Sequence, residues 1–349
     1  MTKNLIHPLL VYSNHGFGSY SSYPIISKYI SNCNTLSILR SEPNSLSKRI
    51  LNRLVRVFAT SQWYRLTSLK LELLLIKQIY KSRPNLIHFL WTERDLGYMN
   101  LISDAIALPL CCTFHCCPED LLEIFPYRKR LRNLSALIIM SETQRSFFES
   151  YGVASHKIHC IPHGIDTDFF VPSSGEKALD DFIVLSVGSY KRNIQLLREV
   201  AVKLKKYSGI CIKIVSSKYF YQYFSDLENV EFTSNLTDFE LVKTYQSSSC
   251  LLLTVENATA NNALLEALAC GLPIVAEDIG GIPEYVNSDC ALVTKAGNSD
   301  LLVEAIVKLS QAPLKQNEMA KAARERALEI SWSKIATKTE ELYSSLIEI

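Results

Sequence analysis

Residues 249–277 read SCLLLTVENATANNALLEALACGLPIVAE and contain a complete strand–helix–strand unit. The apolar run 249–255 predicts one buried strand, and the run 272–277 predicts a second. Between them, Asn261 is a good N-cap residue for a helix, and Gly271 is a typical helix stop. Buried strands joined through a helix indicate a parallel sheet that is covered on both faces.

The same alternation runs through almost all of the 349 residues. We expect strands at 9–13, 86–91, 111–115, 136–141, 182–188, 209–217, 230–234, 249–255 and 272–277. The segment 161–181 has two prolines, two glycines and a run of acids, so we interpret it as a linker. The chain is therefore predicted to be an α/β protein with two doubly wound, Rossmann-like domains at 1–168 and 169–331. The domains would face a cleft at the carboxyl ends of their strands, where such sheets bind ligands.

Composition excludes several classes of protein. The net charge of +2 argues against wholesale nucleic-acid binding, and 48% hydrophobic residues predict a globular chain. There is no apolar run of the ~18 residues that a membrane span needs, and no signal cleavage site, so we expect a cytoplasmic protein. Docking on the inner face of a membrane stays open. Four clustered cysteines (111, 112, 116 and 117) beside His115 lack zinc-site spacing, so we expect thiols and no metal.

The helix that begins near Asn261 and Asn262 is a candidate anion site, because helix N-termini present free N–H groups. Glu266 lies roughly 6–8 Å further along this helix. A nucleotide diphosphate bound at the helix N-terminus would place its ribose near Glu266, and a carboxylate accepts hydrogen bonds from a cis-diol well. The alternative is that Glu266 lies on the exposed face of the helix.

Two further loops of the second half follow predicted strands. The loop VGSYKRN (187–193) carries Lys191 and Arg192, which form either a diphosphate clamp or a solvated basic turn. The loop EDIGGIPEYV (277–286) would present backbone amides at Gly280 and Gly281 and a carboxylate at Glu284.

The first half has weaker candidates. SNHGFGSYSSYP (13–24) contains Gly16 and Gly18, which would let a ligand approach the backbone. It lacks the G-x-G-x-x-G fingerprint, so a nicotinamide enzyme is not expected. His115 and Glu93 each follow a predicted strand; His115 is either a site residue or a structural histidine.

Four segments, in this order, resemble the family 4 glycosyltransferases, which have the GT-B fold. They are 136–170 (ALIIMSETQR…DTDFF), 187–197 (VGSYKRNIQLL), 235–286 (NLTDFELVK…GGIPEYV) and 323–343 (ARERALEISW…ELY). The resemblance implies that a final helix, at 332–349, crosses back to the first domain. It also implies that the second domain holds a nucleotide-sugar donor and the first domain holds the acceptor.

The resemblance implies roles for individual residues. Glu266 matches the second Glu of an E-x7-E pattern and would hold the ribose. Lys191 or Arg192 would neutralise the diphosphate, although the usual spacing of the family's cations is altered here. Gly16 and Gly18 match a glycine-rich loop that lies near the diphosphate and the acceptor. His115 matches a histidine that lies close to the donor sugar.

One position departs from the family pattern. Ala258 stands where the first Glu of E-x7-E belongs, and that Glu contacts the donor sugar in the family. Glu256 lies two residues earlier and cannot be assumed to replace it. Thr259, Asn261 or Asn262 could supply polar contacts instead.

The function implied is transfer of a hexose from a nucleotide-diphosphate sugar to an acceptor hydroxyl, with retention and without metal or other cofactor. The acceptor would be lipid-linked, a polysaccharide or a small molecule. A catalytically silent nucleotide-sugar-binding or scaffold subunit is the alternative, and a GT-B epimerase is disfavoured by the interrupted pattern. Basic and aromatic residues would form either a face for anionic membranes or a solvated helix face; they are Lys48, Arg49, Arg53, Arg56, Trp63, Tyr64 and Arg65.

Overall fold

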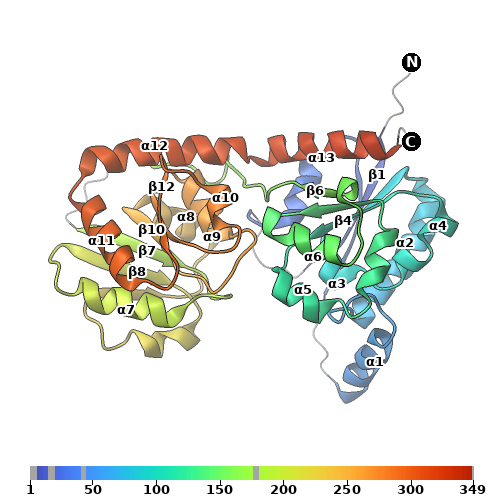
Figure 1. The fold of residues 1–349 in the computed structure, drawn as a ribbon, viewed down its shortest axis with the longest axis horizontal. Coiled ribbons are helices and arrows are strands. Elements are labelled where there is room, and N and C mark those ends of the chain that lie inside the picture. Colours follow the sequence, from blue (N-terminus) through green and yellow to red (C-terminus); the bar gives the residue numbers. More distant parts are fainter. Residues whose placement is uncertain (1–5, 15–19, 41–44, 176–180, 348–349) are drawn as a thin grey trace. The chain divides into compact units, whose positions relative to one another are not determined.

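The computed structural model describes residues 6–14, 20–40, 45–175 and 181–347. The chain forms two compact units (Figure 1). The first unit comprises Met1–His163 and Trp332–Ile349, and the second comprises Gly164–Ser331. Gly16 and Gly18 lie outside the described residues.

The first unit contains a six-stranded parallel sheet of order β2-β1-β3-β4-β5-β6. Its strands are β1 (Pro8–Asn14), β2 (Asn34–Leu39), β3 (Leu86–Phe89), β4 (Leu110–Phe114), β5 (Ala136–Ile139) and β6 (Ile158–Cys160). The chain runs outward from β1 to β2 and then continues on the other side of β1 with β3. The topological switch point, where such sheets bind ligands, therefore lies between β1 and β3.

The helices of the first unit pack on this sheet or on one another (Figure 1). They are α1 (Leu46–Arg56), α2 (Leu66–Ser82), α3 (Thr92–Asp95), α4 (Ser103–Ile106), α5 (Pro118–Ile124), α6 (Arg145–Ser150) and α13 (Trp332–Ile347). Helix α1 projects away from the sheet (Figure 1). One face of α13 is buried, and this face includes Trp332, Ile335, Thr339 and Leu342. Tyr343 of α13 also bonds His88 of β3, with Oη 2.5 Å from Nδ1.

The second unit repeats the architecture with strand order β12-β11-β10-β7-β8-β9. Its strands are β7 (Phe182–Val187), β8 (Ile210–Val215), β9 (Val230–Thr233), β10 (Cys250–Leu253), β11 (Ile274–Asp278) and β12 (Ala291–Lys295). Its helices are α7 (Ile194–Leu204), α8 (Asp238–Gln246), α9 (Asn262–Ala269), α10 (Ile282–Tyr285), α11 (Ser299–Ser310) and α12 (Pro313–Glu329). Here the switch point lies between β7 and β10.

The doubly wound fold is as predicted, with differences in detail. All nine expected strands are present, whereas β2, β6 and β12 were not expected. The chain enters the second unit at Gly164, five residues before the expected start at 169. Much of the expected linker packs on that unit, because the Arg324 guanidinium donates to the Thr167 and Phe170 carbonyls at 2.8 and 2.9 Å. None of the described helices has the length and apolar character needed to cross a bilayer.

Candidate functional site

Three loops of the second unit are tied together at its switch point. They follow β7, β10 and β11 and carry most of the predicted site residues. The Glu256 amide donates to the Lys191 carbonyl at 2.9 Å, which joins the first two loops. The Gly281 amide donates to the Ala258 carbonyl at 2.8 Å, which joins the second to the third. The backbone thus fixes the positions of the side chains described next.

Glu266 is buried, with 4% of its surface exposed, although it is charged and lies on an apolar helix. The alternative, in which Glu266 is an exposed surface acid, is therefore wrong. Its Oε2 accepts a 2.7 Å hydrogen bond from the hydroxyl of Tyr245, which is fully buried on α8. Burial, and then the Glu266 charge, raise the pKa of Tyr245 well above its usual value. The hydroxyl therefore stays protonated and holds the carboxylate in one orientation.

Arg192 is also buried, with 8% of its surface exposed, so the alternative of a solvated basic turn is wrong for this residue. Its Nε and Nη2 both donate to the Val187 carbonyl, at 2.8 and 2.5 Å. Nη2 also lies 3.4 Å from Asn261 Oδ1. Burial lowers the pKa of Arg192 to about 10, while the nearby Tyr245 and Glu266 oppose that shift. Arg192 therefore stays charged at neutral pH and places a cation close to Glu266.

The shape of the β7 loop depends on unusual backbone conformations. Gly188 has a φ of +104°, and an added Cβ there would lie 2.6 Å from Arg192 Nη2. Lys191 adopts a φ of +51°, which is uncommon for a residue with a side chain. The glycine lets the guanidinium fold beneath the loop. Lys191 is only half-buried, so it is the more accessible cation.

Asn261 is the N-cap of α9, as expected, because its Oδ1 accepts from the Leu264 amide at 3.2 Å. The same oxygen receives the long contact from Arg192. Asn262 is exposed at the start of the helix, whereas Thr259 is buried in the preceding loop. The Asn261 side chain therefore holds the start of the helix and the adjoining loop in place, whereas Asn262 lies at the surface.

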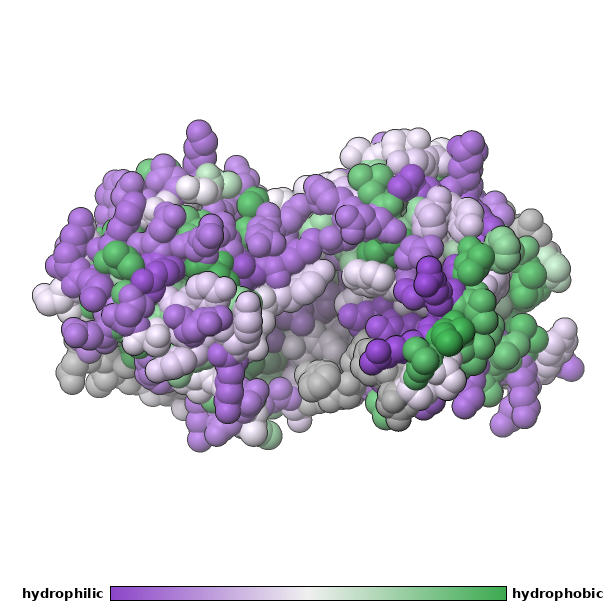
Figure 2. Space-filling view, turned by 90° about the horizontal axis from the view of Figure 1, so that it is seen from below, coloured by the Kyte–Doolittle hydropathy of each residue, from purple (hydrophilic) through white to green (hydrophobic). Residues whose placement is uncertain are grey.

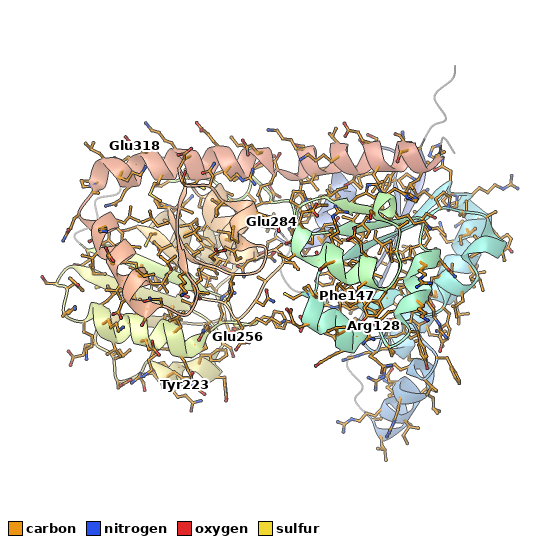
Figure 3. All side chains as sticks on the ribbon, in the orientation of Figure 1. Arg128, Phe147, Tyr223, Glu256, Glu284 and Glu318 are labelled. Atoms are coloured by element: carbon orange, nitrogen blue, oxygen red, sulfur yellow. The ribbon has the colours of Figure 1, made fainter. Side chains whose placement is uncertain are left out.

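The Gly280–Gly281 turn packs directly on the loop that contains Ala258. Gly280 has a φ of +53°, and a Cβ at this position would lie 2.2 Å from the Ala258 carbonyl oxygen. The Gly281 amide donates to that same carbonyl. Contrary to the expectation, this amide is therefore not available to a ligand. Glu256 and Glu284, labelled in Figure 3, are both exposed on loops or short helices of this unit.

In the first unit, His115 directly follows β4 and lies in a cluster of rings. Its ring stacks on Trp91, with centroids 3.9 Å apart and planes at 19°, and it meets Tyr23 edge-on at 4.8 Å. His115 Nε2 lies 2.7 Å from the Leu90 carbonyl oxygen. Because a carbonyl only accepts, Nε2 carries the proton, and Nδ1 is the acceptor nitrogen of the neutral ring.

Burial, and then His163, hold the pKa of His115 well below its usual value. The buried Glu93 lies beneath the same turn, where its Oε1 accepts the amides of His115 and Cys116. Glu93 Oε2 has no hydrogen-bond partner among the described residues, and burial raises the pKa of this carboxyl group. At neutral pH, His115 is therefore an uncharged group on a turn fixed by Glu93.

Sequence reasoning missed Tyr245, Trp91 and Tyr23. No local pattern identifies them, because each meets its partner only in the folded chain. The clustered cysteines are buried thiols, and His, Cys, Asp and Glu form no group of three suited to a metal within the described ranges.

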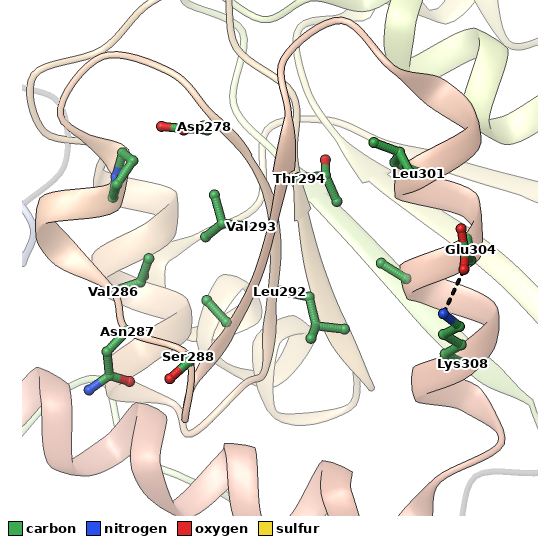
Figure 4. Close-up of a pocket in the computed structure, with 13 residues that line it drawn as sticks. Asp278, Val286, Asn287, Ser288, Leu292, Val293, Thr294, Leu301, Glu304 and Lys308 are labelled. Atoms are coloured by element: carbon green, nitrogen blue, oxygen red, sulfur yellow. Dashed lines mark ion pairs between the residues drawn. The ribbon is translucent and has the colours of Figure 1, made fainter.

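A separate groove of about 670 Å³ lies beside the edge strand β12 (Figure 4). Asp278, Val293 and Leu301 are among its lining residues, and the Glu304–Lys308 ion pair closes one side. None of the predicted site residues lines it. The switch-point cluster is thus the better candidate site.

Comparison with known proteins gives the context for this geometry. The family "Glycosyltransferase Family 4" matches residues 34–169, and "Glycosyl transferases group 1" matches residues 170–326. An MMP alpha-(1->4)-mannosyltransferase of Mycolicibacterium hassiacum is 23% identical over 60% of this chain and 54% of its own length. A D-inositol 3-phosphate glycosyltransferase of Corynebacterium aurimucosum is 25% identical over 74% of this chain and 69% of its own length.

A solved structure gives independent evidence for the fold. The crystal structure of Anabaena HepE in complex with UDP-glucose superimposes with a TM-score of 0.72 at 16% identity, over 98% of this chain and 100% of that one. Two family models that lie end to end, together with this fold, agree with the doubly wound units described above. The chain belongs to the family 4 glycosyltransferases of the GT-B fold.

Proposed function

We propose that the protein transfers a hexose from a nucleotide-diphosphate sugar to an acceptor hydroxyl, with retention and without a metal ion. The observation that supports this most directly is the switch-point cluster of the second unit. There, the buried Glu266, the buried cation of Arg192 and the Asn261-capped start of α9 converge. An apolar protein interior does not gather such groups without a polar role for them.

The ribose of the donor would bind at Glu266. A carboxylate accepts hydrogen bonds from both hydroxyls of a cis-diol, and the Tyr245 hydroxyl keeps it oriented for that contact. HepE binds UDP-glucose, so UDP-glucose is the first donor to test, followed by GDP- and ADP-sugars.

The departing diphosphate would be stabilised by Lys191 and by the first turn of α9. Arg192 holds the β7 loop through the Val187 carbonyl and adds positive potential from below. Fixed charges of this kind lower the barrier because they are in place before negative charge develops on the leaving group. Addition of EDTA would leave the rate unchanged, and the product anomer, read by NMR, would match that of the donor.

His115 would contact the hexose rather than act as an acid. It is neutral, and its Nε2–H already donates to the Leu90 carbonyl, so Nδ1 is suited to accept from a sugar hydroxyl. Replacement of His115 by Gln is expected to slow transfer with little change in melting temperature. A purely structural histidine would show the reverse.

Ala258 leaves the sugar identity open. Its amide and carbonyl are occupied by Asn257 Oδ1 and the Gly281 amide, at 2.8 Å each. Polar side chains near Ala258, rather than its backbone, would therefore distinguish one hexose from another. Thr259 and Asn262 are the first of these to test.

The acceptor is proposed to be lipid-linked, a polysaccharide or a small molecule, and the location cytoplasmic. The alternative, a silent nucleotide-sugar-binding subunit, is favoured only by Ala258.

Release of nucleoside diphosphate from each donor by the purified protein separates the two functions. Turnover that is lost in Lys191→Ala and kept in the exposed control Lys243→Ala supports the transferase. Donor binding without turnover, across all acceptors, would favour the silent subunit.

A further inference from the structure

Helix α1 is an amphipathic helix that buries none of its residues. Val55 is half-buried, and the other large apolar side chains on α1 and the two residues after it are between 41% and 73% exposed; they are Leu46, Ile50, Leu51, Leu54, Val57 and Phe58. A helix of a globular protein normally packs its apolar stripe on a core. A helix whose apolar side chains remain exposed marks an interaction surface.

Charge and hydrophobicity are separated around α1. At 100° per residue, the apolar side chains fall in one half of the helix, and Lys48, Arg49, Arg53 and Arg56 fall in the other half. No acidic residue occurs from 45 to 71. In Figure 1, α1 lies at the lower right, so it faces the viewer in Figure 2, where green and purple residues lie side by side on that part of the first unit.

The exposed basic and aromatic surface includes fewer residues than the sequence predicted. Tyr64 is fully buried and donates to Glu72 Oε2 at 2.6 Å, so it is not part of any exposed face. Trp63 packs against the core of the first unit, and Arg65 is the N-cap of α2. The exposed apolar and basic residues are therefore concentrated in α1.

We propose that α1 lies in the interface of an anionic lipid bilayer. Its apolar half would enter the boundary between headgroups and acyl chains, and the exposed Lys48, Arg49 and Arg53 would meet the anionic headgroups. A protein partner would need a matching apolar groove with an acidic rim, whereas an anionic bilayer supplies both features at once. This inference does not depend on the proposed transfer reaction.

Vesicle co-sedimentation tests the role of the basic residues on α1. We expect the full chain to bind phosphatidylcholine vesicles with 30 mol% phosphatidylglycerol, and to bind pure phosphatidylcholine far more weakly. The pair Arg49→Gln and Arg53→Gln should lower partitioning roughly thirtyfold, since each basic residue contributes about one factor of five to six. The exposed control pair Lys205→Gln and Lys206→Gln should leave it unchanged.

The apolar half is tested by Leu54→Asp, with Leu314→Asp as the control because that leucine is 80% exposed on α12. Only Leu54→Asp should abolish vesicle binding, with unchanged melting and donor hydrolysis in both. Equal binding to neutral and anionic vesicles, or no binding to either, would overturn the proposal. A dimer that Leu54→Asp dissociates, without vesicle binding, would assign α1 to a second copy of the chain.

Discussion

Replacement of Tyr245 by Phe removes one oxygen atom and keeps the ring that packs inside the second unit. The lost hydrogen bond joins a fully buried hydroxyl to the 4%-exposed Glu266, at 2.7 Å. The Tyr245 hydroxyl lies on the fully buried side of this carboxylate, so water does not readily take its place and the lost donor is not replaced. Hydrogen bonds to charged groups contribute about 1.5–3 kcal/mol, which predicts a fall of about 3–12 °C in the melting temperature of this unit.

Differential scanning calorimetry measures this change, with Tyr207→Phe as the matched control. Tyr207 is partly exposed and its ring also packs on the second unit, so its replacement should shift melting by less than about 2 °C. Donor binding should weaken in Tyr245→Phe as well, because Glu266 is no longer held in one orientation. Equal melting in the two variants would refute the account of Glu266 as a fixed carboxylate.

Two further variants test backbone strain and a buried histidine. Gly280→Ala should lower the free energy of unfolding by about 3 kcal/mol or more, because the added Cβ would overlap the Ala258 carbonyl. Gly297→Ala should lower it by about 1 kcal/mol, because Gly297 has a φ of +74° but open space around it. Equal urea midpoints for the two variants would contradict this. Burial lowers the pKa of His88 to about 3, so the unfolded chain binds more protons above pH 3 and stability falls as pH drops below 6.5. From pH 7 to 5 this loss is about 2 kcal/mol, and His88→Gln should remove it from the unfolding profile; a profile parallel to that of the wild type would contradict the assignment.

The central strands were predictable because burial on both faces makes them continuous apolar runs. The three missed strands lie at sheet edges. β2 has no buried residue, and β12 has the pattern of a half-exposed strand, so neither contains a long apolar run. The expected boundary at 168 was late because the segment after Gly164 is held by Arg324, a contact across about 150 residues that no local pattern reveals.

The candidate site was predictable in part. Helix capping at Asn261 follows from local chemistry, and so does the position of Glu266 along α9. The burial of Glu266 does not, because it depends on Tyr245 from α8 and Arg192 from the β7 loop. Spacing could not separate Lys191 from Arg192 either; the difference arises because Gly188 leaves room for one guanidinium beneath the loop.

The central claim is that the second unit binds a nucleotide-diphosphate sugar through Glu266. Isothermal titration calorimetry with UDP-glucose, GDP-mannose and ADP-glucose, on the wild type and on the isosteric Glu266→Gln, tests it most directly. We predict that at least one donor binds the wild type and that Glu266→Gln weakens its Kd about tenfold or more, a loss of about 1.4 kcal/mol or more. An unchanged Kd in the folded variant, or no binding of any donor to the wild type, would contradict the claim.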